Sequence, residues 1–148
     1  MIPRLGEPWL PGKPYRDRPG AYAIILGRGR FRGRILCVWQ GDELQLPGGG
    51  IDPGESPLQA LHREVWEETG WRIQPRTLLA RFQRFAYLPD YGYWARKVQA
   101  VYLADAVRRL GPPQDKDHTL TWLEPMTSIN KLTIVGDRTV LINWLKAD

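Results

Sequence analysis

The sequence contains a single cysteine, Cys37, among its 148 residues. An intramolecular disulfide and a cysteine-based metal cluster are therefore both excluded. The absence of disulfides is typical of proteins that work in a reducing compartment. Cys37 lies within the apolar run ILCVW, where we expect a thiol that packs in the core rather than a nucleophile.

Long hydrophobic runs are also missing. No stretch approaches the roughly 18 apolar residues that cross a bilayer, and the first 20 residues lack the apolar core of a signal peptide. We therefore expect a cytoplasmic protein that does not act at a membrane. Internal repeats and low-complexity blocks are absent, and the length suits one domain with its own core.

The chain carries an excess of positive charge. It has 21 Lys and Arg against 16 Asp and Glu, which gives a formal net charge of +5. Such a balance favours attraction to polyanions such as nucleotides or RNA. Residues 27–34, GRGRFRGR, concentrate four of the arginines. Two interpretations of this segment stay open: a solvated turn, or a contact with phosphate or RNA.

The chain divides at about residue 20. Residues 1–19 contain five prolines, which remove backbone donors and prevent helix, so we expect an extended N-terminal arm. Residues 20–148 are expected to form one domain. The apolar runs 21–26 and 35–40 flank the arginine-rich turn in the pattern of a β-hairpin.

The remaining elements alternate between strand and helix patterns. Residues 89–93 favour a turn, residues 110–118 a polar loop, and residues 137–148 an amphipathic helix. Further strands are predicted over 72–88, 94–105 and 119–125. This order predicts an α/β fold in which a mixed β-sheet is covered by helices on its faces.

Residues 56–69 predict a helix with well-defined ends. Ser56 and Gln59 form the signature of a capping box, and Pro57 suits the first helical position. Gly70 suits the residue just beyond the end of the helix. Leu58, Leu61 and Val65 recur at helical spacing, which predicts a buried apolar stripe.

A second face of this helix is acidic. Glu64, Glu67 and Glu68 stand at positions i, i+3 and i+4, where like charges repel. Arg63 can pair with Glu67 or with Glu55, but one guanidinium cannot neutralise four carboxylates. Two interpretations compete: a solvated acidic face, or oxygen ligands for a hard divalent cation.

The segment before the helix favours the metal interpretation. In residues 47–50, PGGG, the glycines let the backbone approach a ligand closely and expose carbonyl oxygens to it. A glycine run alone usually marks a turn. A glycine run and an acidic helix in fixed register make a much more specific pattern.

Together these residues resemble the Nudix hydrolase box, G-x(5)-E-x(7)-R-E-U-x-E-E-x-G-U, in which U is a bulky apolar residue. The match is complete over residues 49–71, and Trp71 is an aromatic residue at the last apolar position. The matching residues are Gly49, Glu55, Arg63, Glu64, Val65, Glu67, Glu68, Gly70 and Trp71.

The resemblance implies a Nudix fold, with a mixed β-sheet sandwiched between α-helices, and hydrolysis of a nucleoside diphosphate linked to another moiety. It implies Mg²⁺ or Mn²⁺ as cofactor. By the same resemblance Glu64 and Glu68 are direct ligands, and Glu67 is a third ligand or the base for water. The carbonyl oxygen of Gly48 is a further metal contact.

Other residues receive roles by the same resemblance. Arg63 and Glu55 are orienting groups, although Glu55 also complements the charge of the helix N-terminus. Some relatives carry an acid before a Trp-bearing strand, and Asp117 precedes Trp122 in that way. Solvated loop charge is the alternative for Asp117 and the neighbouring Asp115.

Specificity in this family lies outside the box. Substrate contacts are expected from aromatic and basic residues of the strand region and from the histidine before Trp122, with simple packing on the sheet as the alternative for the aromatics. These residues are Tyr87, Tyr91, Tyr93, Trp94, Arg96, Lys97 and His118. His62 is expected to be a surface or packing residue.

A highly charged substrate is favoured: a nucleoside triphosphate, a dinucleoside polyphosphate, or a capped or triphosphorylated RNA end. Nucleotide sugars rank lower. The alternative function is a catalytically silent Nudix-fold module that binds a nucleotide or RNA. A homodimer is a further expectation, because many relatives form one.

Overall fold

The computed structural model describes residues 1–147. The chain forms β1 (Arg16–Asp17), β2 (Gly20–Leu26), η1 (Gly29–Phe31), β3 (Ile35–Gln40), β4 (Glu43–Gln45), β5 (Gly48–Gly50), α1 (Pro57–Thr69), β6 (Trp71–Leu88), β7 (Tyr93–Arg109), β8 (His118–Leu123), α2 (Pro125–Lys131) and α3 (Val135–Lys146).

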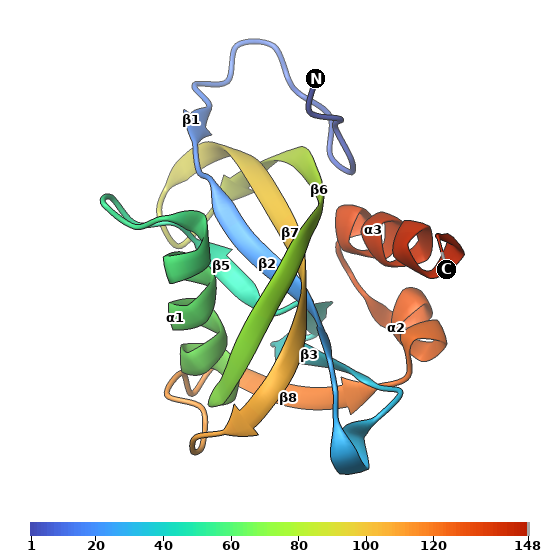
Figure 1. The fold of residues 1–148 in the computed structure, drawn as a ribbon. Coiled ribbons are helices and arrows are strands. Elements are labelled where there is room, and N and C mark those ends of the chain that lie inside the picture. The colour runs from blue at the N-terminus through green and yellow to red at the C-terminus, as the bar shows by residue number, and fades with distance from the viewer. Residues whose placement is uncertain (148) are drawn as a thin grey trace.

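These strands form one mixed sheet with central order β1-β7-β2-β3-β4, while β5, β6 and β8 pair with β2, β7 and β3. β2 runs parallel to β7 along its whole length. α1 lies on one side of the sheet, and α2 and α3 lie on the other side (Figure 1). The predicted mixed sheet between helices is therefore confirmed.

Each face of the sheet buries its own apolar cluster. On the α1 side, Leu61 and Val65 pack against alanines of β2 and β7. On the α3 side, Val140 and Leu141 pack with Phe82 and the larger side chains of the sheet, and Trp144 and Leu145 lie at the edge of that cluster. The predicted amphipathic character of the C-terminal helix is therefore confirmed.

The predicted antiparallel hairpin of β2 and β3 is confirmed only next to its turn. The two strands share only the pair Leu26 and Ile35, and β2 takes β7 as its parallel partner. Six of the seven residues of β2 are buried, as expected for a parallel strand that is covered on both faces. A short run of apolar residues identifies a strand but does not say which strand pairs with it.

Three further predictions need correction. Leu58 is 42% exposed, because Ala60, Leu61 and Val65 make the buried side of α1 instead. The last helix begins at Val135, two residues before the predicted start. The helix α2 was not predicted, although Pro125 occupies its first turn, where proline is favoured.

The N-terminal segment lies along the edge of the sheet formed by β6 and β7 (Figure 1). Its backbone bonds to β6, where Leu5 donates to the Gln83 carbonyl at 3.0 Å. The division of the chain at residue 20 stays a prediction. Within residues 1–147 no helix combines the length and the apolar character that crossing a bilayer requires, while the cytoplasmic location and the homodimer stay predictions.

The end of α1 depends on Gly70, which adopts φ +73, and a β-carbon there would collide with the Gly111 carbonyl oxygen. We expect Gly70→Ala to lower the free energy of unfolding by about 2–4 kcal/mol, from left-handed strain and the clash together. Gly54→Ala is the matched control, because Gly54 has φ +86 with no atom near its β-carbon position. Urea unfolding of both variants checks this, and equal losses would contradict the clash.

The buried carboxyl of Asp137 makes stability depend on pH. It accepts the Leu46 N–H at 3.2 Å, its other oxygen has no partner within the described chain, and burial raises its pKa from 3.8 to about 6. A raised pKa favours the protonated folded state, so stability falls as pH rises from about 4 to about 6. At about 1.4 kcal/mol per pKa unit the loss is roughly 3 kcal/mol.

We therefore expect Asp137→Asn to be at least as stable as the wild type at pH 7, and the difference to shrink below pH 4. An amide keeps one oxygen for the Leu46 N–H and carries no charge. Urea unfolding at several pH values measures this. A variant less stable than the wild type at pH 7 would contradict it.

Candidate active site

Helix α1 is fixed at both ends, which sets the direction of its acidic side chains. The Ser56 hydroxyl accepts the Gln59 N–H at 3.1 Å, and the Gln59 side chain accepts the Ser56 N–H at 2.8 Å. Gly70 closes the helix by donating to the Trp66 carbonyl at 2.8 Å. The predicted capping box and the predicted terminal glycine are confirmed.

Glu68 lies on the buried side of α1, with 5% of its surface exposed. Its Oε1 accepts the Gly48 N–H at 2.9 Å, which joins α1 to β5. Burial raises the pKa of this carboxyl well above its ordinary value, and the bond from Gly48 only partly opposes that shift. Glu68 is therefore a desolvated carboxyl at the base of the site.

The glycines of β5 allow this close approach. Gly48 has φ +144, and a β-carbon there would collide with the backbone of Ala21 and Tyr22. A β-carbon at Gly49 would collide with the carboxyl group of Glu64. Burial also raises the pKa of Glu64. The glycine run is needed for packing against the acidic helix.

Arg63 joins three of the glutamates of the site through its guanidinium group. Its guanidinium contacts Glu55 at 2.7 Å, Glu64 at 2.8 Å and Glu67 at 3.4 Å. It also donates to the Gly50 carbonyl at 3.0 Å. The bonds from Arg63 lower the pKa of Glu55 to about 2. The predicted pairing of Arg63 with Glu55 and with Glu67 is confirmed, and Glu64 joins the same network.

The loop before β8 and the first residue of that strand add further ionisable side chains beside Glu68. His118 Nε2 lies 3.2 Å from Glu68 Oε2, and His118 Nδ1 lies 2.8 Å from Asp115 Oδ2 without hydrogen-bond geometry. Asp115 lines the cleft, whereas Asp117 is exposed and outside its lining. The Asp115 carboxylate accepts a hydrogen bond from the Asp117 N–H at 3.1 Å. This bond closes a tight turn that directs Asp117 away from the cleft.

These residues border a cleft of about 390 Å³ that also has a basic lining. Lys97 on β7 and Arg18, just before β2, line it together with the carboxylates, and Tyr22 lines it as well. Tyr91, 64% exposed, covers the rim with the Arg18 guanidinium 5.6 Å from its ring centre. Burial lowers the pKa of Lys97 to about 8, with Arg84 adding to the effect.

Four of the predicted substrate residues lie outside this cleft. Tyr87 and Trp94 pack on each other at 5.3 Å, and Trp94 also contacts Tyr15 of the N-terminal segment at 5.9 Å. Arg96 pairs with Asp17 at 3.3 Å. Neighbouring residues of a strand point to opposite faces, so Lys97 rather than Arg96 enters the cleft.

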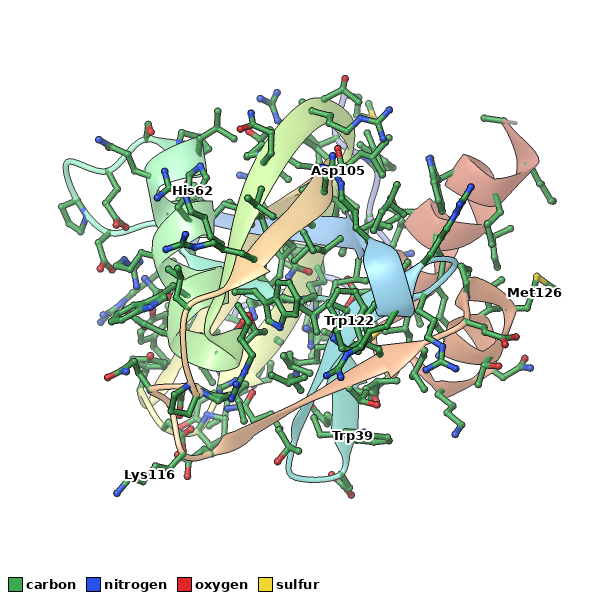
Figure 2. The ribbon with its side chains drawn as sticks, turned by 60° about the horizontal axis from the view of Figure 1, so that its bottom comes forward. Trp39, His62, Asp105, Lys116, Trp122 and Met126 are labelled. Atoms are coloured by element: carbon green, nitrogen blue, oxygen red, sulfur yellow. The ribbon has the colours of Figure 1, made fainter. Side chains whose placement is uncertain are left out.

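The last of the four, Tyr93, lies under the guanidinium of Arg16, 4.8 Å from its ring centre. Three of the residues named from the sequence, Tyr91, Lys97 and His118, do line the cleft. Arg18 was not predicted, because it lies in the N-terminal segment far from the box in the sequence. His62, labelled on α1 in Figure 2, is exposed and is not among the residues that line the cleft, as predicted for a surface residue.

The donor chemistry of the carboxylates in the cleft fits a hard divalent cation, although they do not form a preassembled cluster. In residues 1–147 no group of three His, Cys, Asp or Glu side chains is arranged to hold a metal ion. Arg63 holds Glu64 and Glu67, and Glu68 faces Gly48 and His118. The carboxyls of buried Glu68 and half-buried Glu64 both have raised pKa values, and a bound cation would stabilise their charged forms.

Comparison with known proteins gives a family match over most of the chain. A family model described as NUDIX domain matches residues 16–145. The chain is 29% identical over 146 residues to an RNA pyrophosphohydrolase of Rhodopseudomonas palustris (strain HaA2), covering 86% of this chain and 87% of the relative.

Other matches are shorter or structural. A putative 8-oxo-dGTP diphosphatase of Bacillus subtilis (strain 168) is 39% identical over 67 residues, covering 44% of this chain and 43% of the relative. Several further curated relatives are matched over less than half of their length. A solved NUDIX hydrolase from Nitrosomonas europaea has a TM-score of 0.71 at 19% identity, covering 89% of this chain and 90% of that one. This last likeness concerns the fold alone.

The burial of Glu68 leads to a test of stability. We expect Glu68→Gln, in chelator at pH 8, to have a free energy of unfolding equal to the wild type or up to about 2 kcal/mol higher. The amide keeps an oxygen for the Gly48 N–H and removes a buried charge. Glu67→Gln is the control, because Glu67 is 37% exposed, and we expect a change within about 0.5 kcal/mol. Urea unfolding measures both, and a loss above about 2 kcal/mol in Glu68→Gln would contradict the expectation.

Proposed function

The chain belongs to the NUDIX domain family, and from that membership we propose that it cleaves the pyrophosphate linkage of a polyphosphorylated nucleotide or RNA 5′ end with a divalent cation. The family resemblance and the class of pyrophosphohydrolase enzyme predicted from the sequence are confirmed. The substrate, the metal and the role of each residue belong to the proposal. The silent binding module has no specific observation in its favour.

The observation that carries the proposal is one cleft lined by groups of both charges. Glu64, Glu67 and Glu68 supply its acidic lining, and Arg18 and Lys97 supply its basic lining. A polyphosphate is multiply anionic, so carboxylates alone would repel it. The basic lining binds phosphate oxygens directly, whereas the acidic lining requires a cation between itself and the substrate.

The proposed metal ligands are Glu64 and Glu68, with Glu67 as a third ligand or the base for water and the Gly48 carbonyl as a further contact. Mg²⁺ or Mn²⁺, when bound, supplies positive charge at the phosphate oxygens and lowers the pKa of a bound water. For the acid outside the box we propose Asp115 in place of Asp117, because Asp115 lines the cleft 2.8 Å from His118.

The residues of the chain have separate tasks in this proposal. Arg63 orients Glu64 and Glu67, and is itself fixed by Glu55 and the Gly50 carbonyl. Lys97 and Arg18 hold the anionic substrate in register, so that a water on the acidic side attacks a phosphorus from a defined direction. His118, between Glu68 and Asp115, can hold or pass a proton at Nε2.

A triphosphorylated substrate is supported by the basic residues of the cleft and by the relative named RNA pyrophosphohydrolase. Tyr91 at the rim offers an exposed ring for stacking of a base. Nucleoside triphosphates and RNA with a 5′ triphosphate are therefore the first substrates to compare. Dinucleoside polyphosphates, capped RNA and ADP-ribose complete the panel.

The test is hydrolysis of this panel with Mg²⁺, with Mn²⁺ and in chelator, with identification of the phosphate products. We expect metal-dependent release of phosphate or pyrophosphate from at least one triphosphate. A chain that binds these ligands but releases no product with either metal would contradict the proposal and restore the silent module.

We expect Glu64→Gln and Glu68→Gln to lower kcat by about 100-fold or more, because each removes a proposed ligand at the reacting phosphate. Asp42→Asn is the matched control, since Asp42 is an exposed acid on the turn after β3. Lys97→Met should raise KM by about tenfold, the change expected from one lost charge-assisted hydrogen bond. Steady-state kinetics measure all four variants, and a Glu68→Gln enzyme with full rate would refute the metal assignment.

A further inference from the structure

A second basic region lies at the other end of the sheet. β2 and β7 end there, and β3 and β6 begin there, because Leu26 pairs with both Ile35 and Asp105, and Trp71 pairs with Arg109. The η1 turn closes the same end. Exposed arginines gather on these segments: Arg28, Arg30, Arg32, Arg34, Arg72, Arg76, Arg108 and Arg109.

Little acidic charge balances this region, which we call the arginine end. Asp105 contacts Arg28 at 3.3 Å and Arg76 at 3.7 Å. No other ion pair within residues 1–147 involves these eight arginines. Since the whole chain has a formal net charge of +5, the arginine end holds more than its share of the excess.

Aromatic side chains form an apolar pocket in the middle of this charge. Phe31 of η1 stacks on Trp122 of β8 with ring centres 4.6 Å apart, and Trp71 stands edge-on to both at 5.8 and 5.3 Å. Leu120, Arg30 and Arg109 complete the lining. Figure 2 shows Trp122 and Asp105 on either side of the segment around η1.

We propose that the arginine end and its aromatic pocket bind a single-stranded nucleic acid, with phosphates on the arginines and a base against Trp71 and Phe31. On Phe31 the base takes the place of the Arg30 guanidinium, which lies 4.8 Å from the ring centre. Unpaired bases stack on aromatic side chains whatever their sequence, and arginines along the same groove hold the backbone. The interleaving of arginine with aromatic residues in GRGRFRGR and around Trp71 is the pattern that this mode of binding requires.

The positive charge around the pocket favours a single-stranded nucleic acid over a folded protein or a second copy of this chain. A folded protein would need a densely acidic face to match eight arginines around three aromatic rings. A second copy of this chain would place the same arginines opposite one another, which is unfavourable at moderate salt. A duplex would present its phosphates but keep its bases stacked inside, so the aromatic pocket would remain unfilled.

The proposal is independent of the hydrolytic reaction. The pocket is lined by residues of η1, β6, β7 and β8, and it shares no lining residue with the cleft of the proposed active site. Binding can therefore be measured with an oligonucleotide that has a 5′ hydroxyl and no pyrophosphate. Failure of the proposed catalytic function would leave this measurement unaffected.

The experiment is fluorescence anisotropy of the full chain with a single-stranded RNA of about 12 nucleotides, a DNA of the same sequence and the RNA duplex, at about 50 to 200 mM salt. We expect micromolar or tighter binding of the single strands at the lowest salt and a weaker complex with the duplex. Comparison of RNA with DNA identifies which single strand is preferred.

Two variants separate stacking from charge. Phe31→Ala should raise the dissociation constant about tenfold, and Arg30→Gln should lower the salt slope by about 1. Their controls are Trp9→Ala, an exposed aromatic of the N-terminal segment, and Arg81→Gln, an exposed arginine ten residues along β6 from Trp71. Urea midpoints close to that of the wild type establish that each variant is folded.

Three results would overturn the proposal. The first is no binding of either single strand at the lowest salt. The second is equal binding of duplex and single strand with no effect of Phe31→Ala, which would indicate attraction by charge alone. The third is concentration-dependent self-association that Phe31→Ala abolishes, measured by light scattering, which would assign the pocket to an interface between copies of the chain.

Discussion

The bond from the Gly48 N–H to Glu68 joins β5 and α1, the two elements that make the candidate active site, and the rest of its geometry depends on this contact. A hydrogen bond to a charged group contributes about 1.5–3 kcal/mol, whereas burial of an unpaired carboxylate costs several kcal/mol. The contact therefore offsets only part of the cost of burying Glu68. Part of the free-energy cost of burying the Glu68 charge therefore remains, and a bound cation would offset it. A structure selected for stability alone would place an apolar residue there.

The ion pairs of Arg63 reduce the repulsion among the neighbouring glutamates. Exposed glutamates at helical spacing repel by only a few tenths of a kcal/mol per pair, but burial makes the repulsion larger. Arg63 contacts Glu55, Glu64 and Glu67 and leaves Glu68 to Gly48 and His118. The carboxylates are thus held apart while they remain on one wall. Substrate and cation can enter without first breaking a closed cluster.

The two ends of α1 could be predicted from the sequence because they depend on contacts between residues that are close together in the chain. Ser56, Gln59 and Gly70 act within one turn of α1, and their signature does not depend on the rest of the fold. The partner of β2 could not be predicted, since β2 and β7 are separated by about half the chain. The choice of Asp115 over Asp117 depends on one tight turn, and the choice of Lys97 over Arg96 on which face of β7 turns inward.

The distribution of charge links the two regions of the molecule. The carboxylates of the cleft repel a polyanion until a cation is bound, so the net charge of +5 can attract nucleic acid only through surfaces away from that wall. Attraction decays within about 8–10 Å at physiological salt, so the position of the arginines matters more than their number. Within residues 1–147 the eight arginines form ion pairs only with Asp105, so they leave the carboxylates of the cleft unneutralised. In the two proposals the regions hold different ligands, a cation with phosphates in the cleft and unpaired bases at the arginine end, and neither weakens the charge that the other requires.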